Sequence, residues 1–104
     1  MSRKQYFIVL DTETCNTIEQ PLCYDIGWVV CDRQGKIYVE RSFVIAETFL
    51  DMKDVMQSAY YAEKIPQYWD DIKSGKRQIL GMWNIRKHLL ADMKEYKTNQ
   101  VGAY

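Results

Sequence analysis

The chain has 104 residues, enough for one small domain, and its 47% hydrophobic and 27% charged residues are typical of a soluble globular protein. Lysine plus arginine equals aspartate plus glutamate at 14 each, so the formal net charge is zero. This balance excludes the strong overall positive field of many non-specific nucleic-acid binders. Any contact with nucleic acid is therefore expected to be local.

The apolar run at the start of the chain, Tyr6–Leu10, is too short for a secretory or membrane-spanning segment, so we expect no membrane association and a cytoplasmic protein. The three cysteines are spaced by eight residues, which matches neither a C-x-x-C zinc pair nor a disulfide framework. We predict free thiols, with Cys31 in the core. Cys15 is expected in a polar turn, where a reactive thiol is an alternative.

The first third of the chain predicts three strands. Tyr6–Leu10 is a β-branched and aromatic run, which favours a strand buried on both faces, at the centre of a sheet and more buried than the next two. It is expected to end at Asp11, and the polar stretch 12–21 to form a loop.

The next two strands are expected to form a hairpin. Tyr24–Cys31 and Lys36–Ile45 are both rich in apolar and β-branched residues, and a turn at 32–35 separates them. Gly35 stands where that turn needs a positive φ. The opening of the chain therefore predicts a three-stranded meander.

After the third strand the apolar period changes to three and four residues, which indicates helices. We predict a helix over Thr48–Tyr61, a short helix over Gln67–Lys73 after a proline, and a long helix over Gln78–Tyr96. Val101–Tyr104 has the pattern of the start of a further strand.

Two acids follow the first predicted strand. Asp11 and Glu13 are two residues apart, so in extended backbone both side chains project to the same face and can share a metal ion. Magnesium and manganese prefer such hard oxygen ligands, and a pair of these ions can activate water and stabilise a phosphate in transfer. The alternative is a solvated turn in which Asp11 and Thr12 cap the end of the strand.

The wider pattern resembles a known family. The segments F-I-V-L-D-T-E-T, Y-D-I-G-W-V-V, a glycine turn and I-Y-V-E-R-S-F-V-I are similar to the first motif and following hairpin of the DnaQ-like (DEDD) 3′→5′ exonucleases, which have a ribonuclease H-like fold. The residues that match are Asp11, Glu13, Thr14, Asp25, Ile26 and Gly27.

The resemblance implies an α/β protein with a partial ribonuclease H-like fold: a three-stranded antiparallel meander, then helices and the start of a fourth strand parallel to the first. It implies that Asp11 and Glu13 are catalytic and bind Mg²⁺ or Mn²⁺. It further implies that the backbone around Thr12 to Thr14 holds the terminal nucleotide. The substrate would be the 3′ end of single-stranded DNA or RNA, and a DNA polymerase is a possible partner.

The family's second and third motifs have no counterpart in the 104 residues. We therefore expect one domain that corresponds to the N-terminal part of such an exonuclease, with little or no activity by itself. The alternative is a non-catalytic interaction or regulatory module derived from the same fold. In either case, exposed sheet surface is expected to favour a homodimer or strand exchange.

Other polar residues are weaker candidates. His88 falls within the long predicted helix and is expected at a surface or partly packed position, not as a general base. Asp70 and Asp71 are predicted to lie on a solvated face. Asp25 is expected to be structural. A basic cluster around Gly75 is predicted to be a solvated loop, with phosphate contact as the alternative, and consists of Lys73, Lys76 and Arg77.

The aromatic residues could stack on bases, since single-strand binders pair aromatic rings with basic neighbours. Core packing is nevertheless the prediction for them, because Trp28 lies in an apolar strand and Trp83 in the apolar stripe of a helix. The same two interpretations apply to Trp69 and to the pair Tyr60 and Tyr61.

Overall fold

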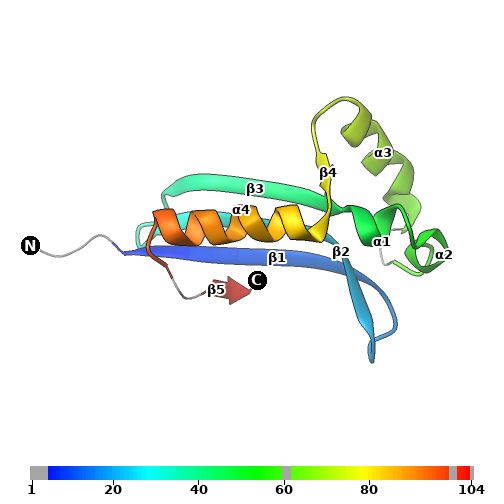
Figure 1. The fold of residues 1–104 in the computed structure, drawn as a ribbon, viewed down its shortest axis with the longest axis horizontal. Helices are drawn as coiled ribbons and strands as arrows, with labels where there is room; N and C mark the ends of the chain where they lie inside the picture. The colour runs from blue at the N-terminus through cyan, green and yellow to red at the C-terminus, as the bar shows by residue number, and fades with distance from the viewer. Residues whose placement is uncertain (1–4, 60–61, 99–100, 104) are drawn as a thin grey trace, which may run out of the picture.

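The computed structural model describes residues 5–59 and 62–98, and the backbone of 101–103. One mixed sheet of five strands runs in the order β4-β3-β2-β1-β5 (Figure 1). The strands are β1 (Tyr6–Asn16), β2 (Pro21–Asp32), β3 (Ile37–Ile45), β4 (Gln78–Leu80) and β5 (Val101–Ala103). The helices are α1 (Ala46–Phe49), α2 (Lys53–Met56), the 3₁₀ helix η1 (Ala62–Lys64), α3 (Ile65–Lys73) and α4 (Met82–Glu95).

The α/β class and the predicted meander are confirmed. Strands β1, β2 and β3 pair antiparallel in chain order, and β5 pairs with β1 in parallel. The β2–β3 turn has Gly35 at φ 86°, and its N–H donates to the carbonyl of Asp32 at 3.1 Å. Glycine suits this position because it adopts positive φ without a Cβ clash.

The loop predicted over 12–21 is wrong for most of its length. Strand β1 continues to Asn16, and the ladder with β2 reaches the pair Asn16 and Pro21. Polar residues can occupy this stem because their side chains are mostly exposed while the partner strand satisfies their backbone. The connection is therefore a short turn at 17–20.

The most buried strand is β2, not β1 as predicted. Tyr24, Ile26, Trp28 and Val30 alternate as buried residues along β2, whereas in β1 only Ile8 and Cys15 are buried. Strand β2 has β1 on one side and β3 on the other, while β5 pairs with β1 only at Ile8–Leu10. Strand β2 is more buried than β1 because of the strands that flank it, and sequence periodicity does not reveal which strands are neighbours.

The helix predicted over 48–61 is also wrong as a single element. The described part of this segment holds α1 and α2, each of four residues, with Met52 at φ −121° and ψ 53° between them. The apolar residues of this segment still pack together, because Phe49 and Met56 are both buried in one cluster. Tyr60 and Tyr61 lie outside the described residues.

The short predicted helix is confirmed as α3, which begins at Ile65 with a proline in its first turn. The long predicted helix begins later than expected. Gln78–Leu80 is strand β4, paired in parallel with Phe43–Ile45 at the sheet edge. Gly81, in extended conformation, precedes α4, whose first N–H is bound by a distant side chain: Met82 N–H donates to both Glu47 carboxylate oxygens at 2.9 and 3.0 Å.

Helix α4 covers one face of the sheet and runs roughly along the direction of β1 and β3 (Figure 1). Its Ile85, Leu89 and Met93, spaced by four, pack into a cluster with Ile8 and Trp28. Val44, between two residues of that cluster on β3, belongs instead to a second cluster beneath α1 to α3. Helices α1 to α3 therefore cover one end of the opposite face.

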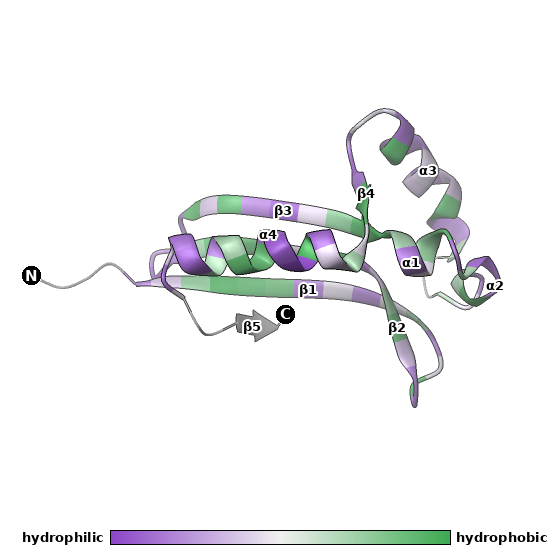
Figure 2. Ribbon diagram, viewed as in Figure 1, coloured by the Kyte–Doolittle hydropathy of each residue, from purple (hydrophilic) through white to green (hydrophobic). Residues whose placement is uncertain are grey.

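Hydrophobic residues follow the inner strands, while the visible side of α4 alternates between hydrophilic and hydrophobic positions (Figure 2). Among the helices of the described residues, none is long and apolar enough to cross a membrane.

Candidate metal site

Asp11 and Glu13 lie on the face of β1 that α4 does not cover. Ile8 and Leu10 point toward α4, since both pack with the cluster that contains Ile85. Side chains alternate between faces along a strand, so Asp11 and Glu13 project together from the opposite face, as predicted. Asp11 is exposed and Glu13 is half-buried.

The cross-strand neighbours of the acids are small or acidic. Asp11 pairs with Gly27 and Glu13 pairs with Asp25. A Cβ on Gly27 would lie 3.1 Å from the Arg41 carbonyl oxygen, so a larger residue would require β3 to shift by a few tenths of an ångström. A shallow depression of about 370 Å³ opens beside Asp11; its lining is Val9, Asp11, Gly27, Trp28, Val29, Glu40, Arg41 and Ser42.

The carboxylate of Glu13 is in an unfavourable environment for its charge. Partial burial raises its pKa above the ordinary value of 4.5, and the nearby charges of Asp11 and Asp25 raise it further. A divalent cation at this point would oppose these effects, because its positive charge favours the ionised carboxylate.

Asp25 is held in a structural network, which agrees with its predicted role. The Tyr68 hydroxyl donates to Asp25 Oδ2 at 2.7 Å, and the Arg77 guanidinium binds both carboxylate oxygens. Arg77 also lies over the Tyr68 ring, 5.5 Å from its centroid. The bidentate pair joins β2 to the segment that leads into β4.

This network corrects the predicted basic cluster. Lys73 and Lys76 are exposed, as a solvated loop requires, but Arg77 is half-buried and bound to Asp25. Tyr68 and Arg77 are 43 and 52 residues from Asp25 in the chain, so no local pattern connects them. Sequence reasoning missed both residues for that reason.

Two buried polar atoms near the acids have no hydrogen-bond partner within the described part of the protein: the Tyr24 hydroxyl and Arg77 Nε. Burial raises the pKa of Tyr24 to about 12, with further contributions from the charges of Glu13 and Asp25. The Tyr24 ring meets that of Tyr68 edge-on at 6.0 Å between centroids. The acids therefore border a packed aromatic region on one side and the open depression on the other.

The donor set fits a hard divalent cation but is small. Carboxylates are suitable ligands for Mg²⁺ or Mn²⁺, and Asp11 and Glu13 share one face. In the ranges 5–59 and 62–98, however, no group of three His, Cys, Asp or Glu side chains is placed to hold a metal ion. Asp25 is engaged by Arg77 and does not complete the site.

The backbone predicted to hold a nucleotide lies just beyond the part of β1 that pairs with β5. Residues Thr12 to Thr14 pair with β2 on one side, while the register with β5 covers only Ile8–Leu10. Thr12 and Thr14 are exposed, and their side chains alternate with those of the two acids. Within the described residues, the β1 edge next to Asp11 is therefore free of strand pairing.

The cysteines are free thiols, as predicted, but their places differ from expectation. Cys15 is in strand β1 and buried, not in a polar turn, and burial raises its pKa, which disfavours the reactive thiolate. Cys31, predicted in the core, is half-buried.

The aromatic predictions divide. Trp28 is buried as predicted, Trp69 is half-buried against Phe49 at 5.1 Å between centroids, and Trp83 is 65% exposed, so its core placement was wrong.

His88 is exposed and stacks on Phe43 at 5.3 Å between ring centroids, which agrees with a partly packed surface position. Asp70 is exposed as predicted. Asp71 is half-buried and accepts a hydrogen bond from Gln67 in its own helix.

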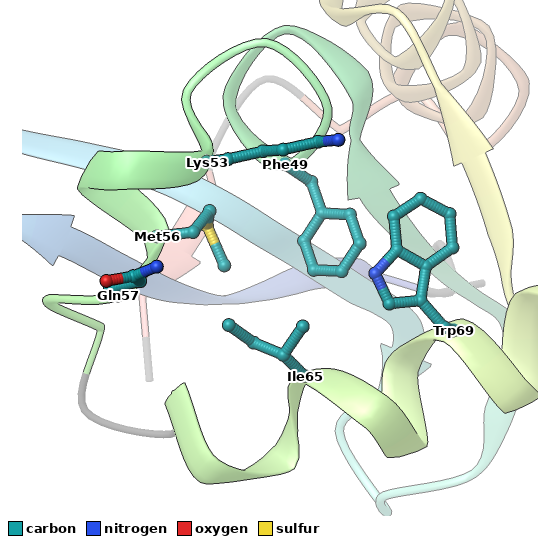
Figure 3. Close-up of a pocket in the computed structure, with 6 residues that line it drawn as sticks. All are labelled: Phe49, Lys53, Met56, Gln57, Ile65 and Trp69. Atoms are coloured by element: carbon teal, nitrogen blue, oxygen red, sulfur yellow. The ribbon is translucent and has the colours of Figure 1, made fainter.

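A separate pocket of about 340 Å³ lies among α1, α2 and α3 (Figure 3). Its lining is apolar apart from two side chains near its edge, and consists of Phe49, Lys53, Met56, Gln57, Ile65 and Trp69. None of these residues lines the depression beside Asp11, so the pocket is not part of the acidic site.

Comparison of the chain with models of known protein families, with curated proteins and with solved structures found no match.

Proposed function

We propose that the chain provides the first metal-binding element of a DnaQ-like 3′→5′ exonuclease, with a partial ribonuclease H-like fold and single-stranded DNA or RNA as substrate. The observation that carries the proposal is the placement of Asp11 and Glu13 on one uncovered face of β1, where they lie close enough for mutual repulsion. That repulsion is what a bound cation would remove.

Each part of the site has a role in this proposal. Asp11 and Glu13 would hold Mg²⁺ or Mn²⁺, which supplies positive charge at a phosphate and lowers the pKa of bound water. Among the described residues no strand pairs with β1 after Leu10 on this edge, so its backbone groups would be offered to the terminal nucleotide. Asp25 would fix β2 against Glu13 through its bonds to Tyr68 and Arg77.

The described residues bring together two free carboxylates, and two carboxylates cannot fix a pair of ions. We therefore expect weak metal binding and little or no hydrolysis by the 104 residues alone. A DNA polymerase as partner stays a prediction of the family resemblance, and a cytoplasmic location stays a prediction from the sequence.

Manganese binding tests the first step. Titration followed by electron paramagnetic resonance should show one weak Mn²⁺ site that Asp11→Ala or Glu13→Ala weakens by at least about tenfold. Glu40→Ala is the matched control, because Glu40 is an exposed acid on the same face and lines the same depression. Equal Mn²⁺ binding by wild type and Asp11→Ala would overturn the site.

Degradation tests the second step. Release of label from a 3′-labelled single-stranded oligonucleotide should require Mn²⁺ and Asp11 in a longer product of the gene, where one is encoded, and be weak in the 104-residue chain. Parallel DNA and RNA substrates identify the preferred sugar. If the protein binds metal but no form of it degrades the oligonucleotide, the proposed metal site is supported and the proposed nuclease activity is overturned.

The alternative is a non-catalytic module of the same fold, and the lack of a third metal ligand among the described residues favours it. Such a module would use the open face of the sheet to bind a second copy or another protein. Light scattering distinguishes the two: a dimer that binds no Mn²⁺ supports the module.

A further inference from the structure

The outward side of α4 carries an exposed aromatic residue between cations. Trp83 is 65% exposed, with the Arg86 guanidinium 5.8 Å and the Lys87 ammonium 5.7 Å from its ring centroid. Two turns after Trp83, Leu90 is 44% exposed. The sheet-facing positions Ile85 and Leu89 fix the rotation of the helix, so this side has nothing to pack against in the described protein.

The charge of this surface is positive although the chain as a whole is neutral. The exposed aspartate, glutamate, lysine and arginine residues of Met82–Glu95 are Arg86, Lys87, Lys94 and Glu95. Asp92 is buried on the sheet side. Because net charge is zero, an anionic ligand would be drawn to such a local surface and not to the molecule at large.

We propose that the Trp83 surface, defined as Trp83, Arg86, Lys87, Leu90 and Lys94, binds single-stranded nucleic acid. A base stacks on the Trp83 indole, and phosphates contact the flanking cations, which is the combination that sequence-tolerant single-strand binding uses. In the free protein, the side chains of Arg86 and Lys87 lie over the indole ring. When a base stacks on the ring and displaces them, their positive charges pair with phosphates of the bound strand.

A nucleic acid suits this surface better than a protein. Lysine is depleted at protein interfaces, and here Lys87 interrupts the apolar side chains of Trp83 and Leu90. The apolar area is therefore divided instead of continuous, unlike the patches that mark protein partners. Arg86, Lys87 and Lys94 have no exposed acid between them in the helix, since Asp92 is buried, so together they complement a phosphate backbone.

The Trp83 surface is independent of the acidic site in position. Asp11 and Glu13 project from the face opposite α4, so a strand bound at α4 would contact the protein away from the acids. The proposal gains from the exonuclease hypothesis but does not need it. Binding can be measured in EDTA, where metal-dependent cleavage cannot occur.

The test is fluorescence anisotropy of a labelled oligothymidylate titrated with the 104-residue protein in EDTA. Trp83→Ala should weaken binding by about tenfold or more, the usual effect of losing one stacked base. Trp83→Phe should recover most of it. The change is expected to leave folding intact, because Trp83 is largely exposed, and circular dichroism checks this.

Charge variants give a second, independent readout. Arg86→Gln with Lys87→Gln should weaken binding and lower the slope of log affinity against log salt by about 1.4, since each single-strand phosphate contact contributes about 0.7. The matched control is Lys73→Gln with Lys76→Gln, which removes two exposed positive charges at the α3–β4 connection. It should bind as the wild type does.

Three results would overturn the proposal: no measurable binding by the wild type, equal binding by Trp83→Ala, or an equal loss in the Lys73 and Lys76 control. A dimer in light scattering that Trp83→Ala dissociates, without oligonucleotide binding, would assign the surface to a second copy. Because binding is measured in EDTA, without the metal ions that cleavage requires, failure of the nuclease proposal leaves this measurement unaffected.

Discussion

Asp92 and Glu13 are carboxylates on opposite faces of the same sheet, and their surroundings have opposite effects on their charge. Asp92 is 2% exposed, receives the Trp28 indole N–H at 2.9 Å, and is bound by Arg41 through two contacts of 3.1 Å. Glu13 is half-buried beside two other acids and is bound by no cation of the described residues.

The pKa of each group reflects this contrast. Burial alone would raise the pKa of Asp92, but the hydrogen bonds from Arg41 and Trp28, with the charge of Arg41, hold it below 3.8. Burial and repulsion both raise the pKa of Glu13. The first carboxylate joins α4 to the sheet and stabilises the fold, whereas ionisation of the second costs stability, as the proposed metal site predicts for Glu13 without a cation.

The largest expected effect is at Asp92. Asp92→Ala leaves the indole N–H of Trp28 buried without an acceptor and removes a charge-assisted pair, so we expect a loss of about 2–4 kcal/mol in the free energy of unfolding. Urea denaturation measures it. Glu95→Ala, an exposed acid in the same helix, is the control and should change stability by less than about 0.5 kcal/mol. A similarly small change for Asp92→Ala would contradict the stabilising role of Asp92.

A smaller effect is expected at Glu47, a third carboxylate with a structural partner. Its side chain accepts the first N–H of α4, so Glu47→Ala should lose about 1 kcal/mol, as for other N-terminal caps. Thermal or urea unfolding measures the loss against Glu19→Ala, an exposed acid in the β1–β2 turn. If the two variants are equally stable, Glu47 does not cap α4.

The smallest effect should have the opposite sign. Glu13→Gln removes a partly buried charge and its repulsion by Asp11 and Asp25, so we expect it to stabilise the protein at pH 7 by up to about 1 kcal/mol while it weakens Mn²⁺ binding. Because folding raises the pKa of Glu13, ionisation destabilises the wild type as pH rises from 4.5 through the raised value. The advantage of Glu13→Gln should therefore be full above that value and vanish below pH 4.5.

Urea titrations at several pH values measure this dependence, with Glu40→Gln as the matched exposed acid on the same face. A gain for Glu13→Gln that persists at pH 4 would show that charge repulsion is not its cause. Loss of stability at pH 7 would place Glu13 with Asp92 as a structural residue and end the contrast between the two faces.

Local pattern was sufficient where a single physical rule decides the outcome. The meander, the glycine turn and the shared face of Asp11 and Glu13 follow from strand alternation and backbone sterics. Ile79 and Leu80 fit either a strand or a helix, so pattern alone assigned them to the helix, and pairing with β3 decided otherwise.

The sequence by itself determined the α/β class, the three antiparallel strands and the two acids on one strand face, because these depend on neighbours a few residues apart. The tertiary structure decided the rest: that Asp92 binds Trp28 and Arg41, that Asp25 binds Arg77, and that Trp83 is left in solvent. These depend on contacts between residues 51 to 64 apart in the chain, and on how α4 is rotated over the sheet. No periodicity in a single segment carries that information.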